Sequence, residues 1–471
     1  MISALLTLGL AAPLVQDYVP PADPAVRAKL ESWQDKKFGL MMHWGTYSQW
    51  GIVESWSLCS EDQPWCSRDG ANYVDYCREY ETLIETFNPT QFDPARWASA
   101  AKGAGMKYVV FTTKHHDGFS MFDTKLTDYS VTGERCAFST NPKANITKEV
   151  FDAFRAEGFW TGAYFSKPDW HHPDYWAPEF ATPNRCNNYD VRKYPERWKR
   201  FQDFTFGQIE ELMTGYGDVD ILWLDGGWVR PNDTITDEVR AWGYQIPAWE
   251  QSVDMPRIAK MARAHQPGLI VVDRSVHGPY EDYRTPEQHV PGELLPYPWE
   301  TCMTMTQSWS YNREPEYKST RELIHTLVDV VAKGGNYLLN VGPGPDGTLD
   351  DEAYERLKGI GEWLDTNGEA IYGTRPALPF VEGAVRYTQK DGAVYATVLV
   401  GGDEPMPTVV EFPGWISGTR KARILGTSAL GLMDRRSALR EGGDSVLLSI
   451  EILPVGWRTA FTVVLEGAIR L

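Results

Sequence analysis

A unit of four parts recurs along most of the chain, and it constrains the fold more than any other feature. Each unit has a helical pattern, a glycine where the helix should end, an apolar run of strand residues and then polar residues. One such unit consists of Pro94–Ala104, Gly105, Lys107–Thr113 and the polar run LysHisHisAspGly at 114–118. Helices and strands that alternate in this way predict a parallel sheet with crossover helices.

The repeated unit predicts where the strands and helices lie. Seven strands are expected, at 38–45, 107–113, 159–165, 221–228, 269–273, 301–306 and 337–341. A possible eighth is Ala370–Gly373. Helices are expected at 94–104, 148–157, 194–213, 256–264, 319–332 and 352–365. We therefore predict an α/β fold with a closed (β/α)8-like TIM barrel, whose ligand site lies at the carboxyl ends of the strands.

Beyond Pro376 the pattern changes to short alternating strands separated by turn signals. Strands are expected at 383–388, 393–400, 409–412, 445–453 and 459–465, with an AspGly turn at 391–392. We predict a catalytic barrel domain over residues 18–376 and an all-β sandwich domain over residues 377–471. Within the first domain, the Pro- and Ala-rich stretch Tyr18–Lys29 is interpreted as a linker into the barrel.

Residues 1–17 contain a short apolar run that ends in small residues, which is typical of a signal peptide. We therefore expect a secreted or periplasmic protein. No other segment approaches the ~18 uninterrupted apolar residues of a membrane-spanning helix. Lys and Arg number 46 against 64 Asp and Glu, a formal net charge of −18, and such a chain would repel phosphate backbones and anionic bilayers. Nucleic acid and membranes are therefore not expected as partners.

The six cysteines are compatible with disulfides outside the cytosol. Cys59 and Cys66 lie in one polar loop, where they could pair with each other. No CxxC sequence is present, which argues against a structural zinc site.

Several polar residues follow the predicted strands and should therefore gather at one end of the barrel. Asp225 follows the apolar run IleLeuTrpLeu and precedes two glycines, so a buried strand would deliver its carboxylate to an open turn. It is either a nucleophile or base, or a residue that caps the turn. Arg274 is either held by a pair of carboxylates at the site or part of an ordinary buried salt bridge.

His43, His115 and His116 are expected at the same end of the barrel. On a regular strand the adjacent His115 and His116 would point to opposite faces and could not bind one ion together. Because HxH and HExxH spacings are also absent, we expect no metal and no cofactor. Imidazoles at strand ends suit a polyhydroxylated ligand better.

A second acid should come from the long loop between the strands at 269–273 and 301–306. Long loops at the catalytic end of a barrel are often functional, and this one could move an acid over the site. The candidates are Glu281, Asp282, Glu287, Glu293 and Glu300.

A series of motifs resembles the α-L-fucosidases of glycoside hydrolase family 29, in the same order over about residues 30–376. They are HisTrpGly at 43–45, GluSerTrp at 54–56, PheAsnPro at 87–89, LysHisHisAspGlyPhe at 114–119, AspIleLeuTrpLeuAspGly at 220–226, AspArg at 273–274, TrpGluThrCys at 299–302, LeuLeuAsnValGlyProGlyProAspGly at 338–347 and GlyGluAlaIleTyrGlyThrArgPro at 368–376. The resemblance implies a retaining, exo-acting α-L-fucosidase that hydrolyses fucosylated oligosaccharides or polysaccharides by a two-carboxylate double displacement.

The resemblance also implies roles for individual residues. Asp225 would be the nucleophile, and the acid/base would be Glu287, in ThrProGluGln at 285–288, with Glu300 as the alternative. The sugar-binding residues would be His43, His115, His116, Arg274 and Tyr164, with Glu54 and Trp56 at the border of the pocket. Three other functions are considered: a non-catalytic fucose- or galactose-binding protein, an α-L-galactosidase, and a metal-dependent barrel hydrolase.

Overall fold

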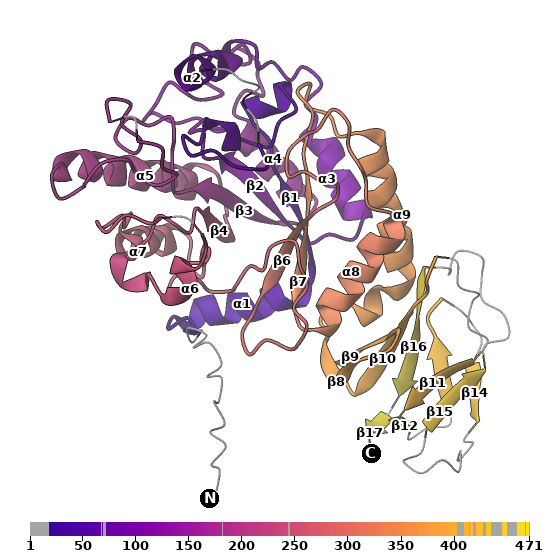
Figure 1. Ribbon diagram of the computed structural model, residues 1–471. Helices are drawn as coiled ribbons and strands as arrows, with labels where there is room; N and C mark the ends of the chain where they lie inside the picture. Colours follow the sequence, from indigo (N-terminus) through magenta and orange to yellow (C-terminus); the bar gives the residue numbers. More distant parts are fainter. Residues whose placement is uncertain are drawn as a thin grey trace, which may run out of the picture.

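The computed structural model describes residues 18–66, 68, 72–180, 182–243 and 245–402, together with the C-terminal segments 409–413, 415–417, 421–426, 430–434, 445–449, 459–466 and 468–470. They form a barrel-like α/β domain and an all-β domain that lies against one side of it (Figure 1). The predicted signal peptide, residues 1–17, lies outside the described residues.

Seven parallel strands form the central sheet, in the spatial order β5-β4-β3-β2-β1-β7-β6. Their bounds are β1 Phe38–Met42, β2 Tyr108–Lys114, β3 Trp160–Ser166, β4 Ile221–Asp225, β5 Ile270–Asp273, β6 Glu300–Thr304 and β7 Asn336–Val341. All seven expected strands are confirmed. Their register brings the carboxyl ends to one edge, because Met42 pairs with Val341 and Ser166 with Asp225.

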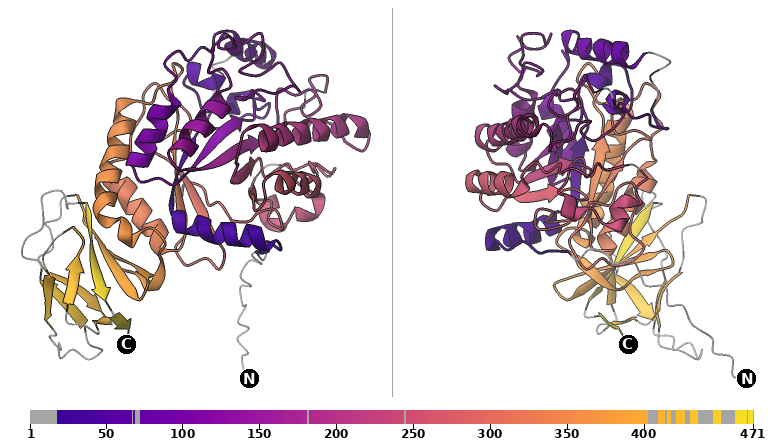
Figure 2. Two further views of the ribbon diagram at one scale, coloured as in Figure 1. Left: turned by 180° about the vertical axis from the view of Figure 1, so that it is seen from behind. Right: turned by 60° about the vertical axis from the view of Figure 1, so that its left-hand side comes forward.

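Helices cover the outer face of this sheet (Figure 2). Those of the α/β domain are α1 Pro24–Lys36, α2 Tyr73–Glu81, α3 Pro94–Gly103, α4 Ile146–Ala156, α5 Pro195–Gly215, α6 Asp237–Arg240, α7 Met255–His265, α8 Thr320–Ala332 and α9 Asp351–Asn367. Short 3₁₀ helices are η1 Thr46–Gln49, η2 Trp56–Leu58, η3 Thr82–Glu85, η4 Asn232–Thr234 and η5 Gly368–Ala370. The six expected helices correspond to α3, α4, α5, α7, α8 and α9.

The strands are buried on both faces, as continuous apolar runs require in a parallel sheet. In β2, Tyr108 and Val110 belong to the cluster inside the barrel, whereas Val109 and Phe111 pack in the layer between sheet and helices. The alternation follows from the two-residue period of a strand.

The expected eighth strand at Ala370–Gly373 is wrong. Ala370 ends η5, and residues 371–373 form a turn. An irregular segment, residues 280–288, instead fills the gap between β5 and β6. Its backbone bonds run from Asp282 N to Val271 O (2.9 Å) on one side and from Gln288 N to Cys302 O (3.0 Å) on the other.

The segment 280–288 is therefore part of the barrel wall, and the ring closes without a regular eighth strand. Its sequence does not resemble a strand because it has no apolar run, and Pro286 cannot donate a ladder hydrogen bond. The sequence suggested that the loop 275–300 could move over the site. Residues 280–288 of this loop are instead bonded to β5 and β6.

The interpretation of Tyr18–Lys29 as a linker is also wrong, because α1 begins at Pro24. The Asp23 side chain accepts a hydrogen bond from Ala25 N, and Pro24 occupies the first turn, where its missing N–H costs nothing. Trp33 of α1 stacks on Tyr283 with ring centroids 4.0 Å apart, inside the barrel. The helix thereby closes the amino-terminal end of the barrel.

The all-β domain contains ten strands within the described residues, and they are β8 Arg375–Glu382, β9 Val385–Lys390, β10 Ala393–Leu399, β11 Val409–Pro413, β12 Trp415–Ser417, β13 Lys421–Ile424, β14 Leu430–Asp434, β15 Ser445–Ser449, β16 Ala460–Glu466 and β17 Ala468–Arg470. Eight of them form one antiparallel sheet, and β12 pairs with β17. The predicted turn between β9 and β10 is present, with positive φ at Asp391 and Gly392. The predicted fold class is thus confirmed. Residues 450–453 of one expected strand lie outside the described residues.

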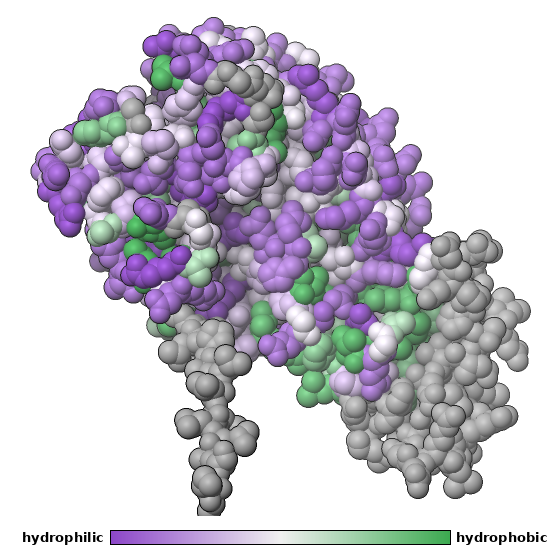
Figure 3. Space-filling view, viewed as in Figure 1, coloured by the Kyte–Doolittle hydropathy of each residue, from purple (hydrophilic) through white to green (hydrophobic). Residues whose placement is uncertain are grey.

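The all-β domain is anchored on α8 and α9. Trp363 Nε1 donates to Ala460 O (2.9 Å), and a ring nitrogen of His325 lies 2.7 Å from Thr459 O. The described part of the face drawn in Figure 3 is mostly hydrophilic, and apolar colour gathers where β8 to β10 of this domain lie. Within the described part of the chain, no helix combines the length and apolar character needed to cross a membrane. All six cysteines are free thiols, so Cys59 and Cys66 do not form the disulfide that the sequence allowed.

Candidate active site

A cavity of about 220 Å³ opens at the carboxyl ends of the strands. Of the ten predicted site residues, His116 and Glu300 alone do not line it. Its walls are Met41, His43, Glu54, Trp56, Trp65, His115, Tyr164, Arg185, Trp223, Asp225, Trp228, Arg274, Glu287, Cys302 and Trp309. A larger cavity, of about 480 Å³, lies against α2 and is lined mostly by apolar and aromatic side chains, with none of the predicted site residues among them.

Asp225 is the last residue of β4, and both of its carboxylate oxygens are engaged. Oδ1 accepts from Arg274 Nη1 (3.0 Å), Oδ2 accepts from the Tyr164 hydroxyl (2.8 Å), and His116 Nε2 lies 3.7 Å from Oδ2. Burial alone would raise the pKa of Asp225, but Arg274, His116 and the Tyr164 hydroxyl outweigh it and hold that pKa well below its usual value. The carboxylate is therefore ionised at neutral pH.

The turn after Asp225 requires glycine. Gly226 has φ +88°, and a Cβ at this position would lie 2.2 Å from Pro168 Cδ. Only glycine combines this conformation with such a close approach of the neighbouring loop. The glycine that follows the acid is thus what lets the strand end and expose the carboxylate.

Arg274 joins two carboxylates. Its Nη1 binds Asp225, its Nη2 donates to Glu287 Oε2, and its Nε donates to Thr285 Oγ1 (3.2 Å). Asp273, its neighbour in sequence, pairs instead with Lys167. The carboxylate pair that holds the guanidinium is therefore Asp225 and Glu287, and both of them line the cavity.

Glu287 and Glu300 lie in different environments. Glu287 lines the cavity from the segment 280–288, and its side chain is 42% exposed. Glu300 is the first residue of β6, at the amino-terminal end of the strand and away from the cavity. Its carboxyl group is fully buried and accepts from Tyr108 OH (2.5 Å), Tyr283 OH (3.1 Å) and Trp223 Nε1 (3.4 Å). Burial raises the pKa of Glu300 to about 7.

The three histidines lie side by side, with the His115 and His116 ring centroids 4.2 Å apart. The expectation that His115 and His116 point to opposite faces is wrong, because β2 ends at Lys114 after a register irregularity and both residues belong to the following turn. Burial lowers the pKa of His116 and of His43 to about 4, so both imidazoles are neutral at neutral pH.

A metal ion is poorly suited to this cluster. Among the described residues, His115, His116 and Asp225 offer ligand atoms that lie within 4.8 Å of one another. However, His115 Nδ1 is 2.6 Å from Ser55 Oγ, and the Arg274 guanidinium on Asp225 would repel a cation.

Glu54 and Trp56 also line the cavity. Glu54 is buried, and its Oε1 accepts from Ser310 N (3.1 Å). Desolvation raises the pKa of Glu54 to about 8, which leaves it protonated at neutral pH. The Trp56 ring lies edge-on to His116, with centroids 5.5 Å apart.

Several lining or supporting residues were not predicted. Asn340 Oδ1 lies 2.7 Å from His43 Nδ1 and fixes that ring; a polar residue near the end of the apolar strand β7 was a usable signal for it. Trp65, Arg185 and Trp309 come from loops, and nothing in their local sequence marks them as part of a pocket.

Two acids bound to one guanidinium, with neutral imidazoles and indoles around them at the carboxyl end of a parallel barrel, define the site of a glycoside hydrolase. The comparisons with known proteins agree with this class. A family model described as alpha-L-fucosidase matches residues 10–369. The chain therefore belongs to the α-L-fucosidase family and is an enzyme that hydrolyses glycosidic bonds.

Individual relatives extend over nearly the whole chain. The α-L-fucosidase of Branchiostoma floridae is 29% identical over 456 residues, which are 90% of this chain and 93% of that protein. The structure of α-L-fucosidase isoenzyme 1 from Paenibacillus thiaminolyticus has a TM-score of 0.75 at 31% identity and covers 94% of this chain and 99% of its own. The α-fucosidase of Thermotoga maritima in complex with fucose has a TM-score of 0.67 at 26% identity, covering 92% and 96%.

Proposed function

We propose that the protein is an exo-acting, retaining α-L-fucosidase that removes terminal α-L-fucosyl residues from fucosylated oligosaccharides or polysaccharides. The observation that carries the mechanism is the Arg274 guanidinium, which binds Asp225 and Glu287 at the same time. Because the two terminal nitrogens of one guanidinium each bind one of these carboxylates, Asp225 and Glu287 lie close together. Such a separation suits retention, for which the two carboxyl groups lie about 5–5.5 Å apart, better than inversion, which needs about 6.5–9.5 Å.

Asp225 is the proposed nucleophile. It attacks the anomeric carbon of the fucosyl residue, the glycosidic bond breaks, and a covalent fucosyl ester forms on the carboxylate. The low pKa of Asp225 keeps it ionised for this attack. Arg274 and Tyr164 bind one oxygen each and fix the orientation of the carboxylate.

Glu287 is the proposed acid/base. In the first step it donates a proton to the leaving oxygen, and in the second it takes a proton from the water that attacks the fucosyl ester. Its place on the cavity wall supports this role. Glu300 is enclosed by Tyr108, Tyr283 and Trp223, and this enclosure leaves it no path to the leaving oxygen.

The cavity is suited to a single deoxy sugar. Neutral His43, His115 and His116, with the protonated Glu54, offer hydrogen-bond partners to hydroxyl groups. Met41, Trp223 and Cys302 add an apolar area to the wall, which favours the methyl group of a fucoside over the hydroxymethyl group of an α-L-galactoside. A volume of about 220 Å³ suits one sugar ring, in keeping with exo action.

Azide rescue tests both carboxylate roles. In Asp225→Ala, azide should take the place of the nucleophile and give the β-L-fucosyl azide, whereas in Glu287→Ala it should attack the fucosyl-enzyme and give the α anomer. NMR of the azide products and of the first-formed sugar distinguishes the two anomers. Full activity of Asp225→Ala, or inversion by the unmodified protein, would refute the proposal. Loss of activity with a chelator and its return with a divalent ion would favour a metal-dependent hydrolase instead.

We also propose that residues 1–17 direct export to the periplasm or the medium. The support is the short apolar run that ends in small residues. Fractionation of cells and mass spectrometry of the mature amino terminus test this, and an intact residue 1 on a protein retained in the cytosol would contradict it.

A further inference from the structure

The rim of the active-site cavity carries an exposed indole. Trp65 lines the cavity and is 51% exposed, and its ring lies edge-on to Trp56 with centroids 5.6 Å apart. Trp56 in turn contacts the rings of Trp170 and Trp228. An apolar face of this size at the mouth of a sugar-binding cavity is exposed to water until a ligand covers it.

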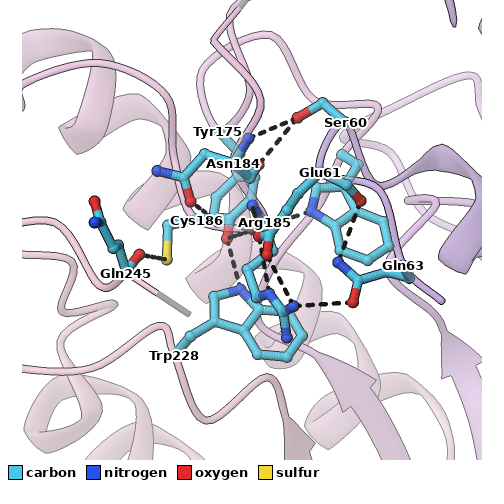
Figure 4. Close-up of polar contacts among 10 residues, drawn as sticks. Ser60, Glu61, Gln63, Tyr175, Asn184, Arg185, Cys186, Trp228 and Gln245 are labelled. Carbon is cyan, nitrogen blue, oxygen red and sulfur yellow. Dashed lines mark hydrogen bonds and ion pairs between the residues drawn. The ribbon is translucent and has the colours of Figure 1, made fainter. Parts of the chain in front are cut away.

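Contacts with a second loop hold the loop of Trp65 in place (Figure 4). Ser60 Oγ donates to Asn184 O (3.2 Å) and accepts from Asn184 N (2.9 Å). Arg185 donates through Nε and Nη2 to the two carboxylate oxygens of Glu61, each at 3.1 Å, and through Nη2 to Gln63 Oε1 (3.0 Å). Three residues before Trp65, namely Ser60, Glu61 and Gln63, are therefore bound to residues 184–185.

Arg185 is itself held by aromatic rings. Its guanidinium carbon lies 5.6 Å from the Trp56 ring centroid and 5.9 Å from that of Trp228. The Arg185 side chain is 9% exposed and that of Glu61 is 32% exposed, so their two-pronged pairing is partly shielded from water and has a defined geometry. Arg185 thus links Trp56 at the cavity wall to the loop that presents Trp65.

The charge at this rim is balanced. The positive charge of Arg185 is offset by Glu61. A negatively charged group bound here would therefore gain little from Arg185 and would be repelled by the net charge of −18. The chemistry of the rim therefore fits an uncharged ligand with an apolar face.

We infer that Trp65 forms the leaving-group subsite, where it stacks on the apolar C–H face of a neutral pyranose attached to the fucosyl residue, and that Arg185 is its positioning residue. The inference rests on the proposed fucosidase function. It gives the enzyme a preference for glycan substrates over fucosides whose leaving group is too small to reach the rim. The Trp65 indole contacts the sugar, and Arg185 acts through the 60–65 loop.

The test compares two substrates that differ only beyond the scissile bond. With α-L-fucosyl fluoride the leaving group is a single atom, whereas with α-L-fucosyl disaccharides, supplied in each hydroxyl linkage to galactose and N-acetylglucosamine, it is a pyranose. Trp65→Ala should lower kcat/KM on the best disaccharide about five- to tenfold, mainly through KM, and change kcat/KM on the fluoride by less than about twofold. Tyr194→Ala, at a surface aromatic that is 43% exposed and does not line this cavity, is the matched control and should change neither.

Arg185→Met should shift the ratio of the two kcat/KM values in the same direction, and Glu61→Gln less so. The Trp65→Ala, Arg185→Met double variant should lose no more disaccharide activity than Trp65→Ala alone, because Arg185 acts through the indole; additive losses would overturn the positioning role. The subsite would be overturned if Trp65→Ala lost kcat/KM equally on the fluoride and the disaccharide, or lost none on either. It would also be overturned if a substrate with a uronic acid leaving group were hydrolysed as well as its neutral counterpart. A protein without activity on the fluoride would refute the proposed function instead.

Discussion

Lys167 and Asp273 form a buried ion pair at the carboxyl end of β4, the strand that carries Asp225. The two residues lie at the carboxyl ends of β3 and β5, the strands on either side of β4. Lys167 follows β3 and also donates to Val229 O (2.8 Å), while Asp273 ends β5. The backbone of Lys167 and that of Arg274, which follows Asp273, also bind β4: Lys167 N donates to Asp225 O (3.0 Å), and Arg274 N donates to Leu224 O (3.1 Å). The pair therefore links the two loops that position the nucleophile and its guanidinium partner.

Removal of the Lys167 ammonium group should impair both stability and catalysis. Lys167→Met leaves Asp273 as a buried carboxylate without its cation, which costs about 3–5 kcal/mol when a buried pair is broken. Loss of the pair should also displace Arg274, which follows Asp273 and binds Asp225, and this displacement should lower kcat. Chemical denaturation and kinetics at a temperature where the variant is folded measure the two effects, and Lys148→Met, in an exposed pair with Asp152, is the control. Unchanged stability in Lys167→Met would contradict the role of the pair.

Glu300 should be structural and Glu287 catalytic. Glu287→Gln should lower kcat/KM about 10²- to 10⁴-fold on substrates with a poor leaving group, since general acid catalysis contributes that much. Glu300→Gln places an amide NH₂ among three donors and should cost about 1–3 kcal/mol of stability, with near-normal kcat/KM at moderate temperature. Thermal denaturation and kinetics of the two variants distinguish the roles. A large kcat loss confined to Glu300→Gln would reverse the assignment.

The placement of the strands and of Asp225 could be read from the sequence because β1 to β7 are buried on both faces and appear as continuous apolar runs. The closing segment 280–288 could not be predicted from the sequence, since it bonds to β5 and β6 without an apolar run of its own. The helix α1 could not be predicted either, because the prolines before it are typical of a linker. Asp23 and Pro24 nevertheless begin the helix.

Within the site, the strand-end rule located His43, Asp225 and Arg274, because parallel strands bring their carboxyl ends together. It also located His115 and His116, but the expectation that these two point to opposite faces was wrong, because alternation no longer applies once the strand has ended at Lys114. The rim residues depend on tertiary contacts between distant loops, and no local pattern encodes such contacts.

Glu54 should give the pH profile an alkaline limb. Its pKa is about 8 in the folded protein, so above that pH a new negative charge forms beside Asp225 and Glu287 and weakens binding of the sugar. We expect kcat/KM to fall above about pH 8 and expect Glu54→Gln, although less active, to fall at higher pH. Normalised pH profiles of the two proteins measure this. Coincident alkaline limbs would exclude Glu54 as the titrating group.

The raised pKa of Glu54 also predicts how the stability of the protein changes with pH. An unfolded Glu releases its proton near the ordinary value of 4.5, whereas folded Glu54 keeps it until about pH 8. Between these values the folded state binds more protons, so the contribution of Glu54 to stability decreases as pH rises. Glu54→Gln should therefore stabilise the protein more at about pH 8 than at about pH 5, as measured by denaturant unfolding.

Lys37 should destabilise the folded state. It follows α1 with φ 61°, is fully buried, and its Nζ has no hydrogen-bond partner among the described residues. Burial lowers the pKa of Lys37 to about 7 from an ordinary value of 10.5. Because the unfolded lysine stays protonated up to the higher value, the cost of folding is largest below about pH 7 and disappears as pH approaches the unfolded pKa.

Lys37→Met should therefore raise the free energy of unfolding by about 2 kcal/mol or more near neutral pH, since each unit of pKa shift corresponds to about 1.4 kcal/mol. The gain should shrink towards about pH 10, because the wild-type lysine is then neutral in the folded state and begins to lose its proton in the unfolded state. Lys102→Met, at a lysine whose side chain is 59% exposed, is the control and should change stability little at either pH. Denaturant unfolding of the three proteins at both pH values measures the effect. A stabilisation of Lys37→Met that is independent of pH would show that lost strain or better packing, and not the buried charge, is responsible.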